Sequence, residues 1–248
     1  MKTKAIPFAA AMFLALAGLT IAFAQQSGQT TETAIQATKK VHAHQFNTST
    51  SRETIPELLP KTTGDLVVWG THISEGMGSM PNAPAYPPEK LVQMACVSDA
   101  AIVGTADSGT SNMTADQRFL LTDWTFTVEE ALKNNPKAPI TPGATITVTE
   151  PGGKLTIDGR NVHAIERNFR SFEKGGRYLL FLEFSPELNT YKAVAENGFQ
   201  LLDNKVVHLT RQALYRNIEK QDARGLLVDA RAAVTAQNPK CVGTDGQP

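Results

Sequence analysis

The side chains best suited to holding a ligand gather between residues 160 and 177, where guanidinium groups alternate with aromatic rings. Guanidinium groups make paired hydrogen bonds with carboxylates and phosphates, and they stack on aromatic faces. The pattern therefore indicates an anionic ligand or a protein partner. The competing interpretation is a surface connection whose phenylalanines close one end of a barrel, and we favour it because aromatic side chains are more often buried than exposed. The candidate ligand-binding residues are Arg160, Arg167, Phe169, Arg170, Phe172 and Arg177.

The residue types that catalysis uses are present, but they do not form a recognisable constellation. No serine lies in a Gly-x-Ser-x-Gly turn. There is no phosphate-cradling glycine loop, because Gly152-Gly153-Lys154 lacks the following Ser/Thr and the upstream glycine. Glu129 and Glu130 are adjacent, so in a regular strand they face opposite sides and cannot act as a pair. The sequence therefore predicts no catalytic residue and no cofactor.

Metal binding is the remaining chemistry to weigh. His42 and His44 form a His-Ala-His pair that, with further ligands, would suit a divalent ion, but their polar surroundings lack the residues that orient a metal ligand. His72, His163 and His208 are isolated in the sequence. Two cysteines are too few for a structural zinc site. We therefore predict no metal site.

The beginning of the chain has the pattern of a secretory signal peptide. Lys2 and Lys4 precede an apolar run over residues 5–23, which ends in Ala22-Phe23-Ala24 before a polar segment. Cleavage after Ala24 fits this pattern better than a membrane anchor, because no basic stop-transfer cluster follows. We expect a secreted or periplasmic protein.

The net charge and the hydropathy of the chain after the expected cleavage argue against two classes of partner, nucleic acids and the membrane interior. Cleavage removes Lys2 and Lys4 from the 24 basic side chains and none of the 24 acidic ones, which leaves a formal charge of about −2. Such a balance gives no bulk attraction to nucleic acid. No segment after residue 24 is apolar enough to span a bilayer, so we expect no integral membrane segment after cleavage.

The two cysteines are Cys96 and Cys241. In an oxidising compartment two cysteines most simply form one bridge, and the alternative is two unpaired thiols. The loop that this bridge closes spans about 145 residues, which in the chain-entropy model is worth up to about 5 kcal/mol of stability.

Periodicity divides the rest of the chain. Residues 25–63 are polar and predict a flexible leader, because they offer little apolar surface to bury. Residues 64–95 predict an extended segment with a short helix near its end, and residues 242–248 a tail. Between them, residues 96–241 predict a barrel domain, in which residues 119–128 alternate apolar and polar side chains as a half-buried strand does.

Turn signals and a helical end complete the predicted fold. Asp158-Gly159 and Asn197-Gly198 are dipeptides typical of two-residue hairpins. Helical stretches follow from Arg211 and over residues 226–236. The fold class is mainly β, a small antiparallel OB-like barrel with a short N-terminal helix and C-terminal helices.

Three stretches in this range resemble a known family: residues 96–105 (CVSDAAIVGT), 128–133 (VEEALK) and 176–181 (GRYLLF). They are similar to the netrin-like domain of tissue inhibitors of metalloproteinases, over roughly residues 95–241. The resemblance implies an OB-like barrel with a C-terminal helix, and a bridge from the first strand region to the end of the domain would suit Cys96 and Cys241. The inhibition does not carry over, because those inhibitors chelate zinc through an N-terminal cysteine with a free amine, and Cys96 lies inside this chain.

Together these observations predict an exported, non-enzymatic binding or protein-interaction module. The alternative is a small hydrolase or metal-dependent enzyme, which would need a histidine and a carboxylate brought together in a pocket by folding. A structural component of the cell envelope is a third interpretation. The netrin-like resemblance bears on the fold and leaves these three functions open.

Overall fold

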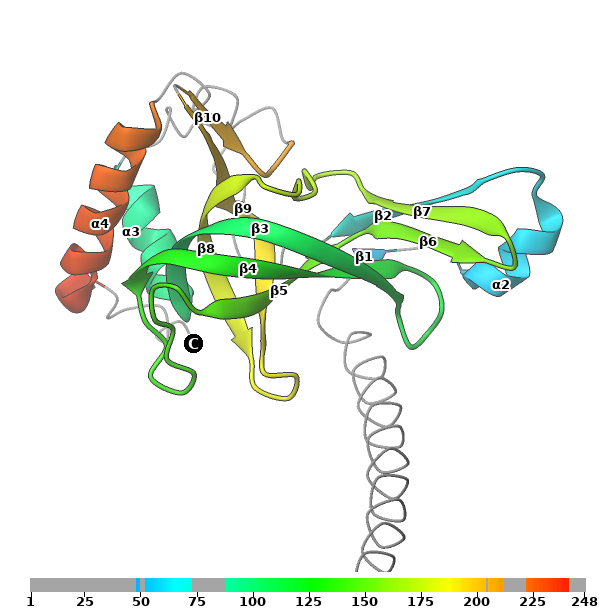
Figure 1. Ribbon diagram of the computed structural model, residues 1–248, viewed down its shortest axis with the longest axis horizontal. Helices are drawn as coiled ribbons and strands as arrows, with labels where there is room; N and C mark the ends of the chain where they lie inside the picture. Colours follow the sequence, from blue (N-terminus) through cyan, green and yellow to red (C-terminus); the bar gives the residue numbers. More distant parts are fainter. Residues whose placement is uncertain (1–47, 50–51, 73–87, 204, 212–221, 241–248) are drawn as a thin grey trace, which may run out of the picture.

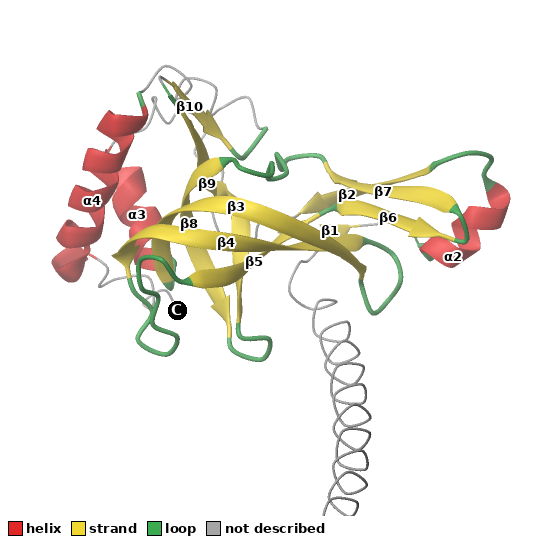
Figure 2. Cartoon of the chain, in the orientation of Figure 1, coloured by secondary structure: helices red, strands yellow, loops and turns green. Residues whose placement is uncertain are grey.

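A closed five-stranded barrel forms the centre of the protein (Figures 1 and 2). Its strands follow the order β9-β5-β4-β3-β8, and β8 also pairs with β9, which closes the ring. All the pairings of the ring are antiparallel except β5 with β9, which is parallel. The predicted mainly β fold with a small OB-like barrel is confirmed. The strands are β3 (Ala100–Met113), β4 (Leu120–Lys133), β5 (Thr145–Pro151), β8 (Arg177–Ser185) and β9 (Thr190–Leu202).

The computed structural model describes residues 48–49, 52–72, 88–203, 205–211 and 222–240.

The barrel encloses one apolar core and carries a second on its outer side. Inside, Phe126, Tyr178 and Leu180 alternate with outward-facing residues along β4 and β8. Outside, Leu179 and Phe181 of β8 pack with the helices α3 (Pro88–Val97) and α4 (Ala223–Lys240), which lie side by side in Figure 1. Because β8 is buried on both faces, its sequence is a nearly continuous apolar run.

A second, smaller sheet forms an arm that extends from the barrel, at the right of Figure 1. The hairpin of β6 and β7 turns at Asp158 and Gly159, whose φ angles of 50° and 75° are those that the predicted two-residue turn requires. On β7, β2 adds in parallel, and the short β1 continues the sheet. The arm consists of β1 (Thr48–Ser49), α2 (Ile55–Leu58), the 3-10 turn η1 (Leu59–Lys61), β2 (Leu66–His72), β6 (Gly153–Ile157) and β7 (Arg160–Glu166).

The end of the predicted flexible leader differs from the expectation. Over residues 52–63 the chain forms α2 and η1, with Ile55 fully buried against the arm sheet. Thr54 and Glu57 form a capping box that satisfies free amides at the start of α2. A few apolar side chains are enough here because the sheet supplies the surface they cover. Residues 25–47 lie outside the described residues.

The expected hairpin at Asn197-Gly198 is wrong. Both residues lie inside β9, where Gly198 pairs with Leu180 of β8 and the four residues that follow pair with β10 (Lys205–His208). The register between β8 and β9 shifts between Ala193 and Gly198, so the strand is irregular there but does not turn back. The Gly198 carbonyl accepts a hydrogen bond from the Leu209 amide at 2.9 Å, and a Cβ at Gly198 would lie 2.4 Å from Leu209 Cδ1. The glycine therefore serves close packing and not a turn.

Two of the segments predicted from the sequence cannot be compared with the structure. The predicted signal peptide and the predicted helix from Arg211 fall outside the described residues, apart from Arg211 itself. None of the described helices combines the length and the apolar run that a bilayer crossing requires.

Candidate functional site

The predicted ligand-binding phenylalanines lie inside the barrel. Phe169 and Phe172 are 2% and 4% exposed, and the Phe172 ring stands edge-on to Phe126 and Tyr178 at centroid distances of 5.0 and 4.9 Å. Such edge-to-face contacts add to the free energy that burial supplies. The two rings belong to the apolar core, as the structural interpretation of this stretch expects.

A buried carboxyl group supports the same loop. The Phe172 amide donates to Glu150 Oε2 at 2.8 Å, and Glu150 is only 2% exposed. Burial raises the pKa of Glu150 to about 8, although hydrogen bonds to its carboxylate act in the opposite direction. Glu150 therefore holds a proton at neutral pH in the folded protein.

The predicted arginines separate onto different parts of the molecule. Arg160 is structural, because its guanidinium group donates to the Leu59 and Gly64 carbonyls and to the Thr62 hydroxyl, and so ties the end of the arm together. Arg170 is exposed, and its amide donates to the carbonyl that follows β10. Arg167 and Arg177 lie on the arm and at the edge of the barrel respectively. The stretch from 160 to 177 therefore does not form one site.

Arg167 takes part in an exposed aromatic cluster. Its guanidinium carbon lies 5.4 Å from the centre of the Trp69 ring, a cation–π distance, and Trp69 is 50% exposed. Val67, two residues earlier on β2, is 45% exposed. The register places Val67 beside His163 and Trp69 beside Ile165, so these side chains share one face of the sheet. We call Val67, Trp69, His163, Ile165 and Arg167 the arm face.

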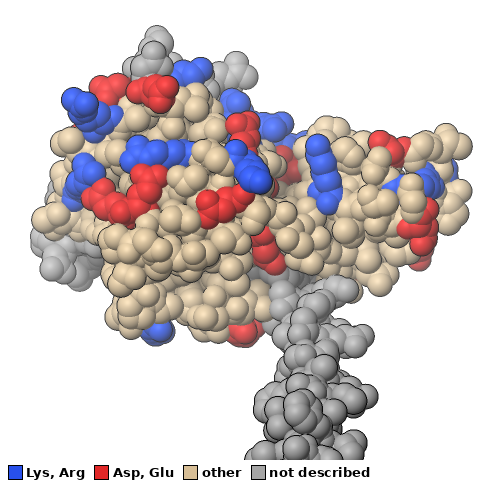
Figure 3. Space-filling model, in the orientation of Figure 1, with Lys and Arg blue, Asp and Glu red and all other residues tan. Residues whose placement is uncertain are grey.

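The arm face has a basic margin. Lys154 of β6 lies opposite His163 and is exposed. Figure 3 shows that the arm carries few charged side chains on the side in view, whereas charged groups of both signs gather over the barrel and its helices. A large aromatic ring held under a guanidinium group, on a sheet, is a combination that protein interfaces favour.

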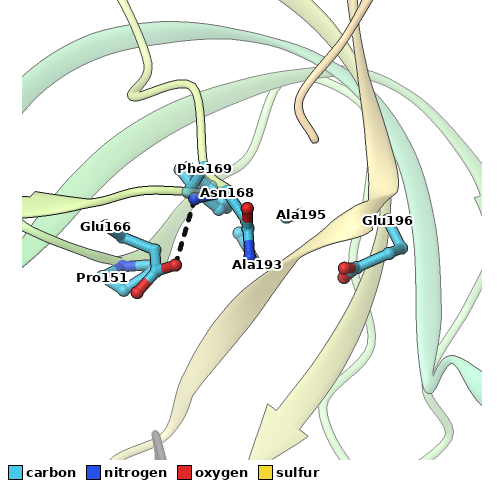
Figure 4. A pocket seen from close by; sticks show the side chains of 7 residues that line it. All are labelled: Pro151, Glu166, Asn168, Phe169, Ala193, Ala195 and Glu196. Carbon is cyan, nitrogen blue, oxygen red and sulfur yellow. Dashed lines mark hydrogen bonds between the residues drawn. The ribbon is translucent and has the colours of Figure 1, made fainter. Parts of the chain in front are cut away.

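A small cavity lies where the arm joins the barrel (Figure 4). Glu166 and Glu196 approach it from opposite sides, with the Asn168 amide between them. Glu166 Oε1 accepts from the backbone N–H of Asn168 at 3.1 Å, and Glu166 Oε2 has no hydrogen-bond partner within the described ranges. The cavity measures about 10 Å³, enough for one water molecule. It is too small for an organic ligand.

A larger groove of about 370 Å³ runs between the end of β9 and α4. Three arginines and several apolar side chains share its walls, and Arg177 is the only residue of the predicted set among them. The lining residues are Arg177, Leu201, Leu202, Asp203, Ala223, Arg224, Leu227 and Arg231.

The histidines do not meet a carboxylate in either hollow. His208 is buried, which lowers its pKa to about 3, and its Nδ1 accepts from the Thr210 amide at 3.0 Å. His163 lies on the arm face. Neither lines the cavity or the groove, and the described residues contain no group of three metal-binding side chains. His42 and His44 lie outside the described residues.

The helices next to Cys96 and Cys241, the two cysteines of the predicted disulfide bridge, pack against each other. Cys96 is in the last turn of α3, α3 packs against α4, and α4 ends one residue before Cys241. Cys241 itself lies outside the part of the chain that the structure describes. The bridge stays a prediction.

Sequence reasoning missed Trp69, Arg224 and Arg231. For Trp69 a signal exists, because Leu66 and Val68 alternate with Val67 and Trp69, and only one of these pairs can face the arm core. Arg224 and Arg231 are seven residues apart, which places them on one face of a helix. What the sequence could not supply is that this helix face meets Arg177.

Comparison with models of known protein families and with curated proteins found no match to this chain. The netrin-like resemblance is therefore neither supported nor contradicted.

Proposed function

We propose that the protein is an exported, non-enzymatic interaction module, and that the arm face holds a protein partner. The observation that carries this proposal is Trp69, which is half exposed on a sheet and covered on one side by the Arg167 guanidinium group. Tryptophan and arginine are the residues most enriched among those that dominate binding energy at protein interfaces.

The chemistry of the arm face suits a partner that offers acidic and apolar side chains together. Val67, Trp69 and Ile165 supply apolar area, and Arg167 and Lys154 supply positive charge at its margin. An acidic side chain next to the Trp69 ring would pair with Arg167 without displacing it. Charge complementarity of this kind mainly sets the rate and the specificity of association.

The fold of the arm supports binding because the surface is preformed. Arg160 fastens the turn after η1 to β7, and Ile55 fills the opposite face of the sheet. A surface that is already ordered loses little conformational entropy when a partner binds. We propose that the barrel is related to the netrin-like domain. We do not propose that the protein inhibits proteases by zinc chelation, which in that family needs an N-terminal cysteine.

The proposal is tested by isolating a tagged, exported form of the chain with whatever binds it. Trp69→Ala should lose the co-isolated partner, and Val228→Ala, which changes another exposed apolar residue (57% exposed, on α4), should retain it. Both variants should melt at the wild-type temperature, which separates lost binding from lost folding. Equal retention by the two variants would contradict the proposal, as would recovery of a second copy of this chain as the only partner.

A further inference from the structure

The groove between β9 and α4 carries its own binding chemistry, away from the arm. Figure 1 shows α4 standing beside the end of the barrel where β9 runs on to β10, and Figure 3 shows basic and acidic side chains gathered on that side of the molecule. From its lining we propose that the groove binds a small organic anion: a carboxylate or phosphate group carried on a short apolar body. The site is independent of the arm face.

A bulge in β4 brings two carboxylates to the rim of this groove. The register pairs Val103 with Glu130 and Gly104 with Val128, so Glu129 is an extra residue in β4. Arg177 and Arg231 line the same groove, and they are held by Glu129 and Glu130 respectively. The expectation that these adjacent glutamates face opposite sides assumed a regular strand, and the bulge interrupts that alternation here.

The two ion pairs fix the arginines in place. Arg177 Nε donates to Glu129 Oε2 at 2.7 Å, and Arg231 donates to both oxygens of Glu130 through Nε and Nη2 at 2.8 and 2.6 Å. The hydrogen bonds from Arg231 lower the pKa of Glu130. A guanidinium group held in this way keeps its remaining N–H groups in a defined direction, which suits recognition of a planar carboxylate or a phosphate.

Unused donors face the groove. Arg224 is exposed and makes no hydrogen bond or ion pair with the described residues, and only Nε of Arg177 is engaged there. Glu129 and Glu130 pair with Arg177 and Arg231, and Asp203 also lines the groove, so the three arginines are matched by three carboxylates. Arg224 is the arginine that has no ion pair with a carboxylate among the described residues. We therefore expect Arg224 to contribute most of the electrostatic attraction and the other two arginines to orient the anion.

The apolar side chains of the groove favour a ligand that carries a short apolar group as well as an anionic group. Leu201 and Leu227 are 5% and 8% exposed and form part of the wall, together with Leu202 and Ala223. The groove volume of about 370 Å³ is within the range of small-molecule sites, which combine apolar walls with a few polar groups. A bare inorganic anion would leave these leucines unused, and an uncharged body would leave Arg224 unused.

The test uses isothermal titration calorimetry to measure how tightly the purified mature chain binds hexanoate and hexyl phosphate. Inorganic phosphate, which lacks the apolar body, and hexanol, which lacks the charge, are the comparison compounds. We expect at least one of the two organic anions to bind more tightly than both comparisons. Arg224→Gln should weaken that binding by about tenfold or more, because it removes a charge-assisted contact. The preference between hexanoate and hexyl phosphate identifies the head group.

Two controls make the result decisive. Arg118→Gln, which removes an exposed arginine from the turn between β3 and β4, should bind the ligand as the wild type does. Trp69→Ala should also bind it normally, which separates this site from the arm face. Binding that is unchanged in Arg224→Gln, hexanol that binds as tightly as the anions, or no saturable binding at millimolar concentrations would each overturn the proposal.

Discussion

The barrel and the arm bury their side chains in different ways. The barrel fills its interior with rings such as Phe126 and Tyr178, and it covers its outer β8 side with α3 and α4. The arm buries one face of its sheet against α2 and the start of β4, while Val67 and Trp69 on the other face are about half exposed. This difference indicates that the barrel stabilises the fold and the arm presents a surface.

Reduction of the predicted bridge should loosen the helices beside the barrel and leave the arm unchanged. If Cys96 and Cys241 are joined, a reductant removes up to about 5 kcal/mol in the chain-entropy model, which lowers the melting temperature by roughly 10 °C or more. Hydrogen exchange should then rise in α3 and α4 and stay unchanged in the arm. A Cys96→Ser, Cys241→Ser variant is the control, since reductant should not affect it. Equal melting temperatures of the wild type with and without reductant would contradict the bridge.

Removal of an aromatic ring should destabilise the barrel more than the arm. Phe172→Ala should lower the free energy of unfolding by about 3–5 kcal/mol, because it leaves a cavity among buried rings. Trp69→Ala should change it by less than about 1 kcal/mol, because exposed side chains contribute little. Urea denaturation monitored by circular dichroism measures both. Similar losses in the two variants would mean that the arm face is structural.

The stability of the barrel should depend on pH through the buried carboxyl group of Glu150. The pKa of Glu150 is raised to about 8 in the folded protein, above its ordinary value of 4.5. The stability that this group contributes is therefore complete below about pH 4.5, and it is lost as the pH rises from there through about 8.

Glu150→Gln keeps an acceptor for the Phe172 amide and removes the titration. The loss of stability between pH 4.5 and 8, of the order of a few kcal/mol, should be present in the wild type and reduced in this variant. His208 acts in the opposite direction, because burial lowers its pKa to about 3 and its contribution is lost as the pH falls below about 6.5. Identical pH profiles for the wild type and Glu150→Gln would show that Glu150 is ionised in the folded state.

Much of the fold follows from local sequence patterns. The alternation over residues 119–128 predicts a half-buried strand, and β4 occupies that position. Asp158-Gly159 predicts a tight hairpin because both residues tolerate positive φ, and the structure has such a turn there. These predictions succeed because the chemistry that decides them lies within a few residues.

The failures come from contacts that are distant in sequence. Asn197-Gly198 has the composition of a turn, yet it lies inside β9, where Gly198 pairs with Leu180 of β8 and Leu209 packs on the glycine. Residues 160–177 suggest one site because their arginines are close in sequence. The path of the chain from β7 to β8 carries Arg160 into the arm, Arg167 over Trp69 and Arg177 to the groove.

If the arm face holds a protein partner, as we propose, a group placed at Trp69 should lie within reach of that partner. A photo-reactive amino acid is placed at position 69 or, as a control, at position 228, and cells that produce the protein are irradiated. We expect one discrete adduct with another protein from position 69 and none from position 228, and we expect Arg167→Ala to abolish the adduct. Equal labelling from both positions, or no adduct from position 69, would contradict the proposal.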